Sequence, residues 1–171
     1  MAAGLSVQPN ELVPRPVQTS DQIRYATSPS PTGHEEDTIE KSRKPNSARK
    51  PPVPSDSHAE IDDWMLRVMP DLQPIVRQLD ETIRATIDGL QYAVKWKRAF
   101  YGLPAVGWII EIVAYDVSVN AVFFGGSDFD ASPPLGSTGR ERYVKVKTLE
   151  EAQRPEMHEW IGQAGRVRGW K

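Results

Sequence analysis

The chain contains no cysteine among its 171 residues. This absence excludes disulfide bonds, thiolate nucleophiles, and zinc or iron–sulfur sites that depend on cysteine ligands. An excess of charge of one sign is also lacking, because the formal net charge is only −2. The whole chain therefore offers no electrostatic case for nucleic acid as its main partner, and any basic surface must be local.

Long apolar runs and catalytic motifs are missing as well. The apolar runs stay well short of the roughly 18 residues that cross a bilayer, and the first residues lack the basic-then-apolar order of a signal peptide. We therefore expect a cytoplasmic protein. Because the sequence has no GxxxxGK, GxGxxG or GxSxG motif, we predict that it is not an enzyme and that it acts by binding.

Aromatic residues are scarce in the first 55 positions, which hold only Tyr25 but nine of the fifteen prolines. Such a segment has too little apolar surface to offset the entropy of ordering. We predict a disordered, proline-rich tail and linker over residues 1–56 and one α+β domain over residues 57–171. The motifs SPSP (28–31) and PPVP (51–54) leave open whether the tail is a plain spacer or a recognition segment.

Two helices are predicted at the start of the domain. Ser57 to Glu60 matches a capping box, with Ser57 as the N-cap, so the first helix is expected to begin there and to end near Pro70. Apolar residues continue at helical spacing over 72–87, and Asp88-Gly89 ends this second helix.

The sheet is predicted from the segments that follow. Residues 92–97 alternate with period two, 106–114 and 117–124 are apolar runs joined by a short turn, and 142–147 alternate again. A last helix starts at Leu149, and the terminal GRVRGWK is expected to fray. The prediction is an α+β fold, with helices packed on one face of a mostly antiparallel sheet of four or more strands.

This order of elements resembles the YdhG-like family, a widespread bacterial family whose domain long had no assigned function. The resemblance covers about residues 59–164, and the motifs that carry it are Val94-Lys95-Trp96 with Tyr101 five residues after the tryptophan, AYDVSVNAVFFGG (114–126) and RYVKVKTLEE (142–151). It implies a frataxin-like fold. Because one family member is described as an intracellular iron chaperone, it also implies iron binding and delivery to iron-accepting proteins.

Candidate iron ligands gather at the start of the first predicted helix. A protein that must release iron needs weak, exposed oxygen ligands such as carboxylates. Glu60 and Asp63 share one helix face, and His58 is one turn from Asp62. These four residues are the predicted metal site. The alternative is that the acids merely complement the positive end of the helix dipole and cover a solvated face.

A second candidate site, of another class, uses the polar side of the predicted sheet. On the first and fourth predicted strands, alternate residues are mostly basic or aromatic, and these residues are expected to point to one side of the sheet. We predict that this side binds an anion, a nucleic acid or a protein. Nucleic acid is the least favoured of the three, because the chain is acidic overall. The alternative is a solvent-facing surface on which lysines only discourage edge-to-edge association. The candidate ligand-binding residues are Lys95, Lys97, Tyr101, Tyr143, Lys145 and Lys147.

Overall fold

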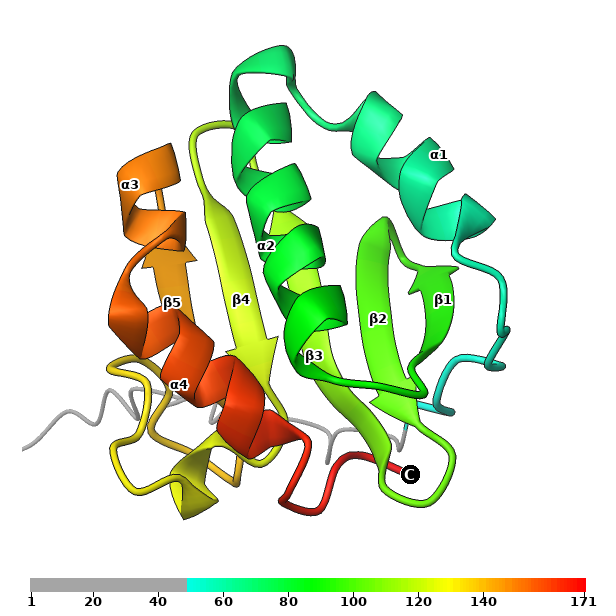
Figure 1. Ribbon diagram of the computed structural model, residues 1–171, viewed down its shortest axis with the longest axis vertical. Helices are drawn as coiled ribbons and strands as arrows, with labels where there is room; N and C mark the ends of the chain where they lie inside the picture. Colours follow the sequence, from blue (N-terminus) through cyan, green and yellow to red (C-terminus); the bar gives the residue numbers. More distant parts are fainter. Residues whose placement is uncertain (1–48) are drawn as a thin grey trace, which may run out of the picture. The chain divides into compact units, whose positions relative to one another are not determined.

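The computed structural model describes residues 49–171 (Figure 1). In this part of the chain the elements are α1 (Ala59–Arg67), the 3₁₀ turn η1 (Pro70–Leu72), α2 (Gln73–Thr86), β1 (Gln91–Lys95), β2 (Arg98–Leu103), β3 (Gly107–Ala114), β4 (Val119–Phe123), the 3₁₀ turn η2 (Gly126–Asp128), β5 (Arg142–Val146), α3 (Leu149–Ala152) and α4 (Pro155–Ala164). None of the described helices is long and apolar enough to cross a membrane. Residues 1–48 of the tail and linker predicted over 1–56, with the SPSP motif, lie outside the described residues.

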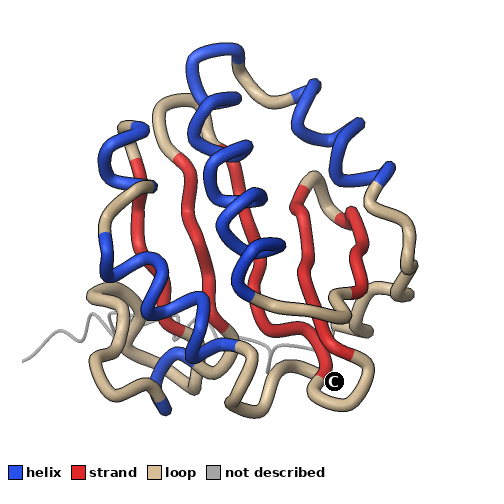
Figure 2. Tube along the Cα trace, in the orientation of Figure 1, coloured by secondary structure: helices blue, strands red, loops and turns tan. Residues whose placement is uncertain are grey.

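The strands of residues 49–171 form one antiparallel sheet in the order β1-β2-β3-β4-β5. The helices lie over one face of this sheet (Figure 2). We call the opposite side the open face. The predicted α+β class with helices on an antiparallel sheet is confirmed, and the sheet of the described residues has five strands, within the predicted four or more.

The additional strand arises at a tight turn between β1 and β2. Trp96 and Lys97 have φ values of 54° and 61°, the left-handed conformation that both central residues of a type I′ hairpin require. The strand predicted over residues 92–97 is found as β1 but ends at Lys95. The turn and β2 were not predicted, because Trp-Lys carries none of the Asn-Gly signal usual for this turn. The indole N–H of Trp64 donates a 3.0 Å hydrogen bond to the Lys97 carbonyl and stabilises the turn.

The predicted capping box of the first helix is also wrong. His58, rather than Ser57, is the N-cap of α1, and the Ser57 hydroxyl accepts a 3.3 Å bond from the Ala59 N–H. Glu60 does not reach back to Ser57, because its carboxylate accepts a 3.3 Å bond from the Val94 N–H of β1. The side chains at this helix start therefore join α1 to the sheet.

The main core lies between the helices and the sheet. Each helix contributes apolar residues at intervals of three and four, and each strand contributes alternate residues, as these two periodicities require. Its fully buried members include Ile61, Val76, Leu79, Ile83, Tyr101, Ile110, Ile112, Phe123, Met157 and Ile161.

A second, smaller apolar cluster lies on the open face. It consists of Ala93, Phe100, Trp108 and Phe124, with Trp170 packed against them. Trp108 and Trp170 exchange two backbone hydrogen bonds of 2.9 and 2.8 Å. The prediction that GRVRGWK frays is therefore wrong, because Trp170 pairs with β3 and packs against this cluster.

The residues before α1 run beside β1. Ser55 exchanges two backbone hydrogen bonds with Tyr92, of 2.9 and 2.7 Å, and Pro52 is buried. The Lys95 ammonium donates a 3.3 Å bond to the Lys50 carbonyl. The end of the predicted linker is thus laid along the sheet edge and brings Arg49 beside the β1–β2 turn.

Candidate functional site

A groove of about 540 Å³ is lined by residues from the C-terminal end of α1 and from the β1–β2 and β3–β4 turns. These three segments lie in the upper part of Figure 1. We call it the Trp96 groove. Its lining comes from these three segments, which are far apart in the sequence: Trp64, Arg67, Val68 and Met69; Val94, Lys95, Trp96 and Lys97; and Ala114, Tyr115 and Asp116.

The walls of the Trp96 groove combine exposed apolar surface with positive charge. Met69 is 54% exposed, Tyr115 is 49% exposed and Trp96 is 44% exposed, which is unusual for side chains of this size. Three cationic side chains line the groove, namely those of Arg67, Lys95 and Lys97, against one carboxylate, that of Asp116. The groove is therefore suited to a ligand that is both acidic and apolar.

Trp96 is held in place from several directions. The Lys95 ammonium lies 4.4 Å from the centroid of the indole, a cation–π distance. The Phe100 ring meets it edge-on with centroids 6.2 Å apart. A left-handed backbone at a non-glycine residue costs about 1–2 kcal/mol, and such residues are concentrated at functional sites. The turn thus presents a large aromatic ring in a fixed orientation.

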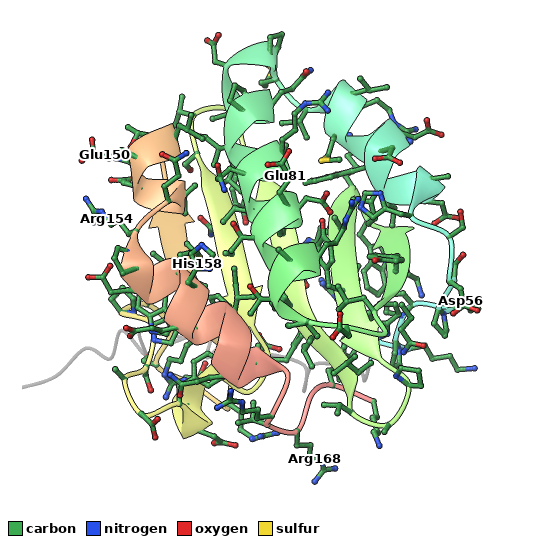
Figure 3. The ribbon with its side chains drawn as sticks, viewed as in Figure 1. Asp56, Glu81, Glu150, Arg154, His158 and Arg168 are labelled. Carbon is green, nitrogen blue, oxygen red and sulfur yellow. The ribbon has the colours of Figure 1, made fainter. Side chains whose placement is uncertain are left out.

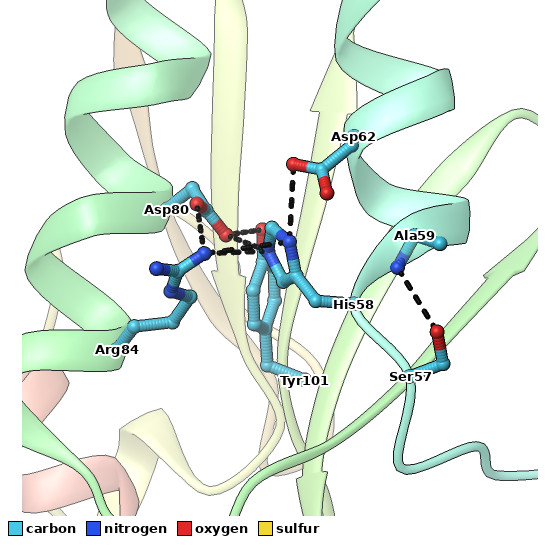
Figure 4. Close-up of polar contacts among 7 residues, drawn as sticks. All are labelled: Ser57, His58, Ala59, Asp62, Asp80, Arg84 and Tyr101. Atoms are coloured by element: carbon cyan, nitrogen blue, oxygen red, sulfur yellow. Dashed lines mark hydrogen bonds and ion pairs between the residues drawn. The ribbon is translucent and has the colours of Figure 1, made fainter.

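Beneath α1 lies a cluster of polar side chains centred on Asp80 (Figure 4). The Asp80 carboxylate is only 4% exposed. Its Oδ1 accepts a 3.0 Å hydrogen bond from the Tyr101 hydroxyl and lies 2.7 Å from His58 Nε2, and its Oδ2 lies 3.6 Å from the Arg84 guanidinium. The cluster joins α1, α2 and β2 around one buried charge.

His58 bridges two carboxylates. Its Nε2 faces Asp80, and its Nδ1 lies 3.1 Å from Asp62 one helical turn away. Arg84 Nη1 also lies 3.4 Å from both ring nitrogens. The contacts of His58 thus tie the start of α1 to α2.

Tyr101 belongs to this cluster and not to a surface. Its burial, together with the charge and the hydrogen bond of Asp80, raises the pKa of the Tyr101 hydroxyl well above its ordinary value of 10.0. Burial also raises the pKa of Tyr92, whose ring lies 4.9 Å from that of His58. The prediction that Tyr101 lies on the exposed side of the sheet is wrong, because the turn after β1 places this residue on the helix-covered face.

The six candidate ligand-binding residues do not form one face. Lys95 is on β1 and Lys145 is on β5, the two outer strands of the described sheet. Four strand spacings of about 4.8 Å separate them by about 19 Å. Tyr143 and Lys145 alternate with Val144 and Val146, as predicted, and Lys147 follows the end of β5. Only Lys95 and Lys97 meet in one site, the Trp96 groove.

The four candidate metal ligands are placed differently from one another. His58 and Asp62 come together, whereas Glu60 bonds to the backbone of β1, and Asp63 is exposed. Among the described residues, no group of three or more His, Cys, Asp or Glu side chains is arranged to hold a metal ion. The other helical acids are spread over separate helices, as Figure 3 shows for Glu81 and Glu150.

Comparison of the chain with protein-family models, with curated proteins and with solved structures gave no match. The YdhG-like resemblance therefore stays a prediction that rests on the motifs in the sequence. The interpretation of the protein's function therefore rests on the geometry of the Trp96 groove and of the Asp80 cluster.

We predict that Tyr101 does not ionise in the folded protein at pH values where an ordinary tyrosine does, near pH 10. In a spectrophotometric titration, Tyr101→Phe should leave the tyrosinate absorbance change around pH 10 unchanged in the native state. In denaturant, the tyrosinate absorbance change of the same variant should be smaller than that of the native sequence by the contribution of one of the five tyrosines. A raised folded pKa also means that the stability contributed by Tyr101 is present below about pH 10 and is lost above it. A smaller native absorbance change in Tyr101→Phe would contradict this assignment.

Proposed function

We propose that the protein is a non-catalytic binding domain whose Trp96 groove holds an acidic, partly apolar segment of a partner protein. The observation that supports this function is the joint presence of exposed aromatic side chains and unbalanced cations around one groove of about 540 Å³. Sites of this size with apolar walls and a few directed polar groups are typical of binding pockets.

The apolar part of the proposed ligand would cover Trp96, Tyr115 and Met69. Burying a large apolar side chain is worth about 1.5–3 kcal/mol. Aromatic residues and methionine are enriched at protein interfaces, and tryptophan, tyrosine and arginine dominate their binding energy. Val117, the next exposed apolar residue on the β3–β4 turn, is 76% exposed and would extend the same surface.

The acidic part of the ligand would meet Arg67, Lys95 and Lys97. These side chains are solvent-accessible, so their attraction would act mainly on the rate of association and on the choice of partner, and salt would weaken it. Acidic peptide is favoured over nucleic acid because the whole chain is acidic and the groove has only these three cations.

The left-handed turn supports the proposal because it limits the entropic cost of binding. The Trp64 indole bonds to the Lys97 carbonyl, and Lys95 and Phe100 hold the Trp96 ring. A side chain that is already ordered loses little freedom when a ligand arrives. Trp96 is therefore the residue we expect to contribute most to affinity.

Iron binding and delivery is the second candidate, together with the YdhG-like identity and the cytoplasmic location expected from the sequence. Its support is the resemblance and the 3.1 Å contact between His58 and Asp62. Iron would be cargo bound through exposed carboxylates, which suit hard cations. The groove is the better supported of the two sites, since Asp80 already engages His58.

The groove proposal predicts binding of a fluorescein-labelled peptide of alternating glutamate and leucine. Trp96→Ala should weaken binding at least about tenfold, the loss of a typical interface hot spot. Lys97→Glu should weaken it and flatten its salt dependence, while the matched control Lys145→Glu on the far edge strand should leave it unchanged. Fluorescence anisotropy at two salt concentrations measures all three effects. Equal binding by Trp96→Ala and the native protein would refute the proposal.

The iron proposal predicts uptake of ferrous iron by the full chain under anaerobic titration. Uptake should fall in a triple alanine variant of the predicted site, and it should persist in a matched triple variant of the C-terminal helices. The two variants change Glu60, Asp62 and Asp63 in the first case and Glu150, Glu156 and Glu159 in the second. No uptake, or the same uptake by both variants, would rule out the predicted ligands.

A further inference from the structure

The open face of the sheet carries a second cavity, which shares Trp96 with the Trp96 groove. Its volume is about 230 Å³. Three aromatic side chains line it, those of Trp96, Phe124 and Trp170, and two carboxylates, those of Glu111 and Glu141. We call it the open-face pocket. Aromatic rings combined with carboxylates are the usual surroundings of a bound organic cation.

A guanidinium group already lies at this pocket. Arg49 lines it, and the Arg49 Cζ is 5.5 Å from the centroid of the Trp96 ring, a cation–π distance. Arg49 precedes Ser55, which is bonded to β1, so the cation comes from the segment that leads into the domain. Arg49 thus shows that the Trp96 wall of the pocket can accept a guanidinium group.

The charges of the pocket balance only when Arg49 is counted. Arg98 Nη1 lies 2.5 Å from Glu111 Oε1, and these two charges form a partly buried pair. Burial raises the pKa of Glu111, while the charges of Arg98 and Arg49 act in the opposite direction. Glu141 adds a second carboxylate at the rim, so the pocket without Arg49 carries one excess negative charge.

We propose that the open-face pocket recognises the guanidinium group of an arginine side chain on a partner protein, and that Arg49, which lies over the Trp96 wall of the pocket in the free protein, competes for this ring as an internal ligand. Arginine fits better than lysine because its planar group stacks on an indole while it donates paired hydrogen bonds to carboxylates. The open-face pocket shares only Trp96 with the Trp96 groove, and its charge and its proposed ligand are different.

An internal ligand lowers the apparent affinity for an external one. The segment before α1 holds the Arg49 side chain beside Trp96, and a tethered group of this kind has an effective concentration in the millimolar range. A small external ligand must compete with that concentration for the Trp96 ring, whereas the ring is fully available in a variant without the Arg49 side chain. Removal of the Arg49 side chain should therefore strengthen binding, which is the opposite of the usual effect of deleting a contact residue.

The test uses N-acetyl-arginine amide as the probe and the full chain as the protein, with tryptophan fluorescence and calorimetry as readouts. Arg49→Ala should bind the probe about five- to tenfold more tightly than the native protein, in line with competition at millimolar effective concentration. The neighbouring control Lys50→Ala should bind like the native protein. In the Arg49→Ala background, the exposed substitution Glu141→Gln should weaken binding again.

Three results would overturn the proposal: equal affinity of Arg49→Ala and the native protein, no effect of Glu141→Gln, or equal affinity for N-acetyl-lysine amide. The outcome is distinguishable from that of the groove experiment, because the probe is cationic rather than acidic. Glu141 and Trp170 line only the open-face pocket of the two sites.

Discussion

The buried carboxylate of Asp80 is the constraint on which the arrangement of the domain depends. Removing a charge from water costs several kcal/mol unless hydrogen bonds and an opposite charge replace the solvent. Asp80 obtains these from His58 of the α1 cap, Arg84 of α2 and Tyr101 of β2. Because each partner comes from a different element, satisfying one carboxylate fixes α1 against α2 and both against the sheet.

The position of α1 in turn determines the binding surface. α1 carries Trp64, whose ring packs in the main core and whose indole N–H holds the carbonyl of the β1–β2 turn. That turn orients Trp96, which lines both the Trp96 groove and the open-face pocket. A chain of contacts therefore runs from the buried polar cluster to the two proposed sites. We therefore expect a substitution of Asp80 to alter the orientation of Trp96 at the surface.

Much of the fold could be predicted from the sequence, and the errors have definite causes. The β3–β4 hairpin was expected at 106–114 and 117–124 and is found close to those limits, because long apolar runs with a short connection allow few alternatives. The β1–β2 turn was missed because Trp and Lys replace the usual turn residues. That single omission also moved Tyr101 to the wrong face, since side chains alternate along a strand.

The site was harder to predict than the fold. Asp80 falls on the apolar stripe of the second helix, four residues after Val76 and beside Leu79, and a carboxylate in that position signals a buried polar cluster. Its partner His58 is 22 residues away, a separation that no helical spacing reveals. Likewise, the contact of Arg49 with Trp96 and the pairing of Trp108 with Trp170 join segments that only the tertiary structure brings together.

A double-mutant cycle on His58 and Asp80 tests most directly whether this carboxylate fixes α1. The free energy of unfolding would be measured for the native protein, His58→Ala, Asp80→Asn and the double variant, with His158→Ala on α4 as a distant control partner for Asp80→Asn. We predict a coupling energy of about 1.5–3 kcal/mol between His58 and Asp80, the range for hydrogen bonds to charged groups, and additivity within about 0.5 kcal/mol for the control pair. A His58–Asp80 coupling as small as that of the control pair would contradict the account.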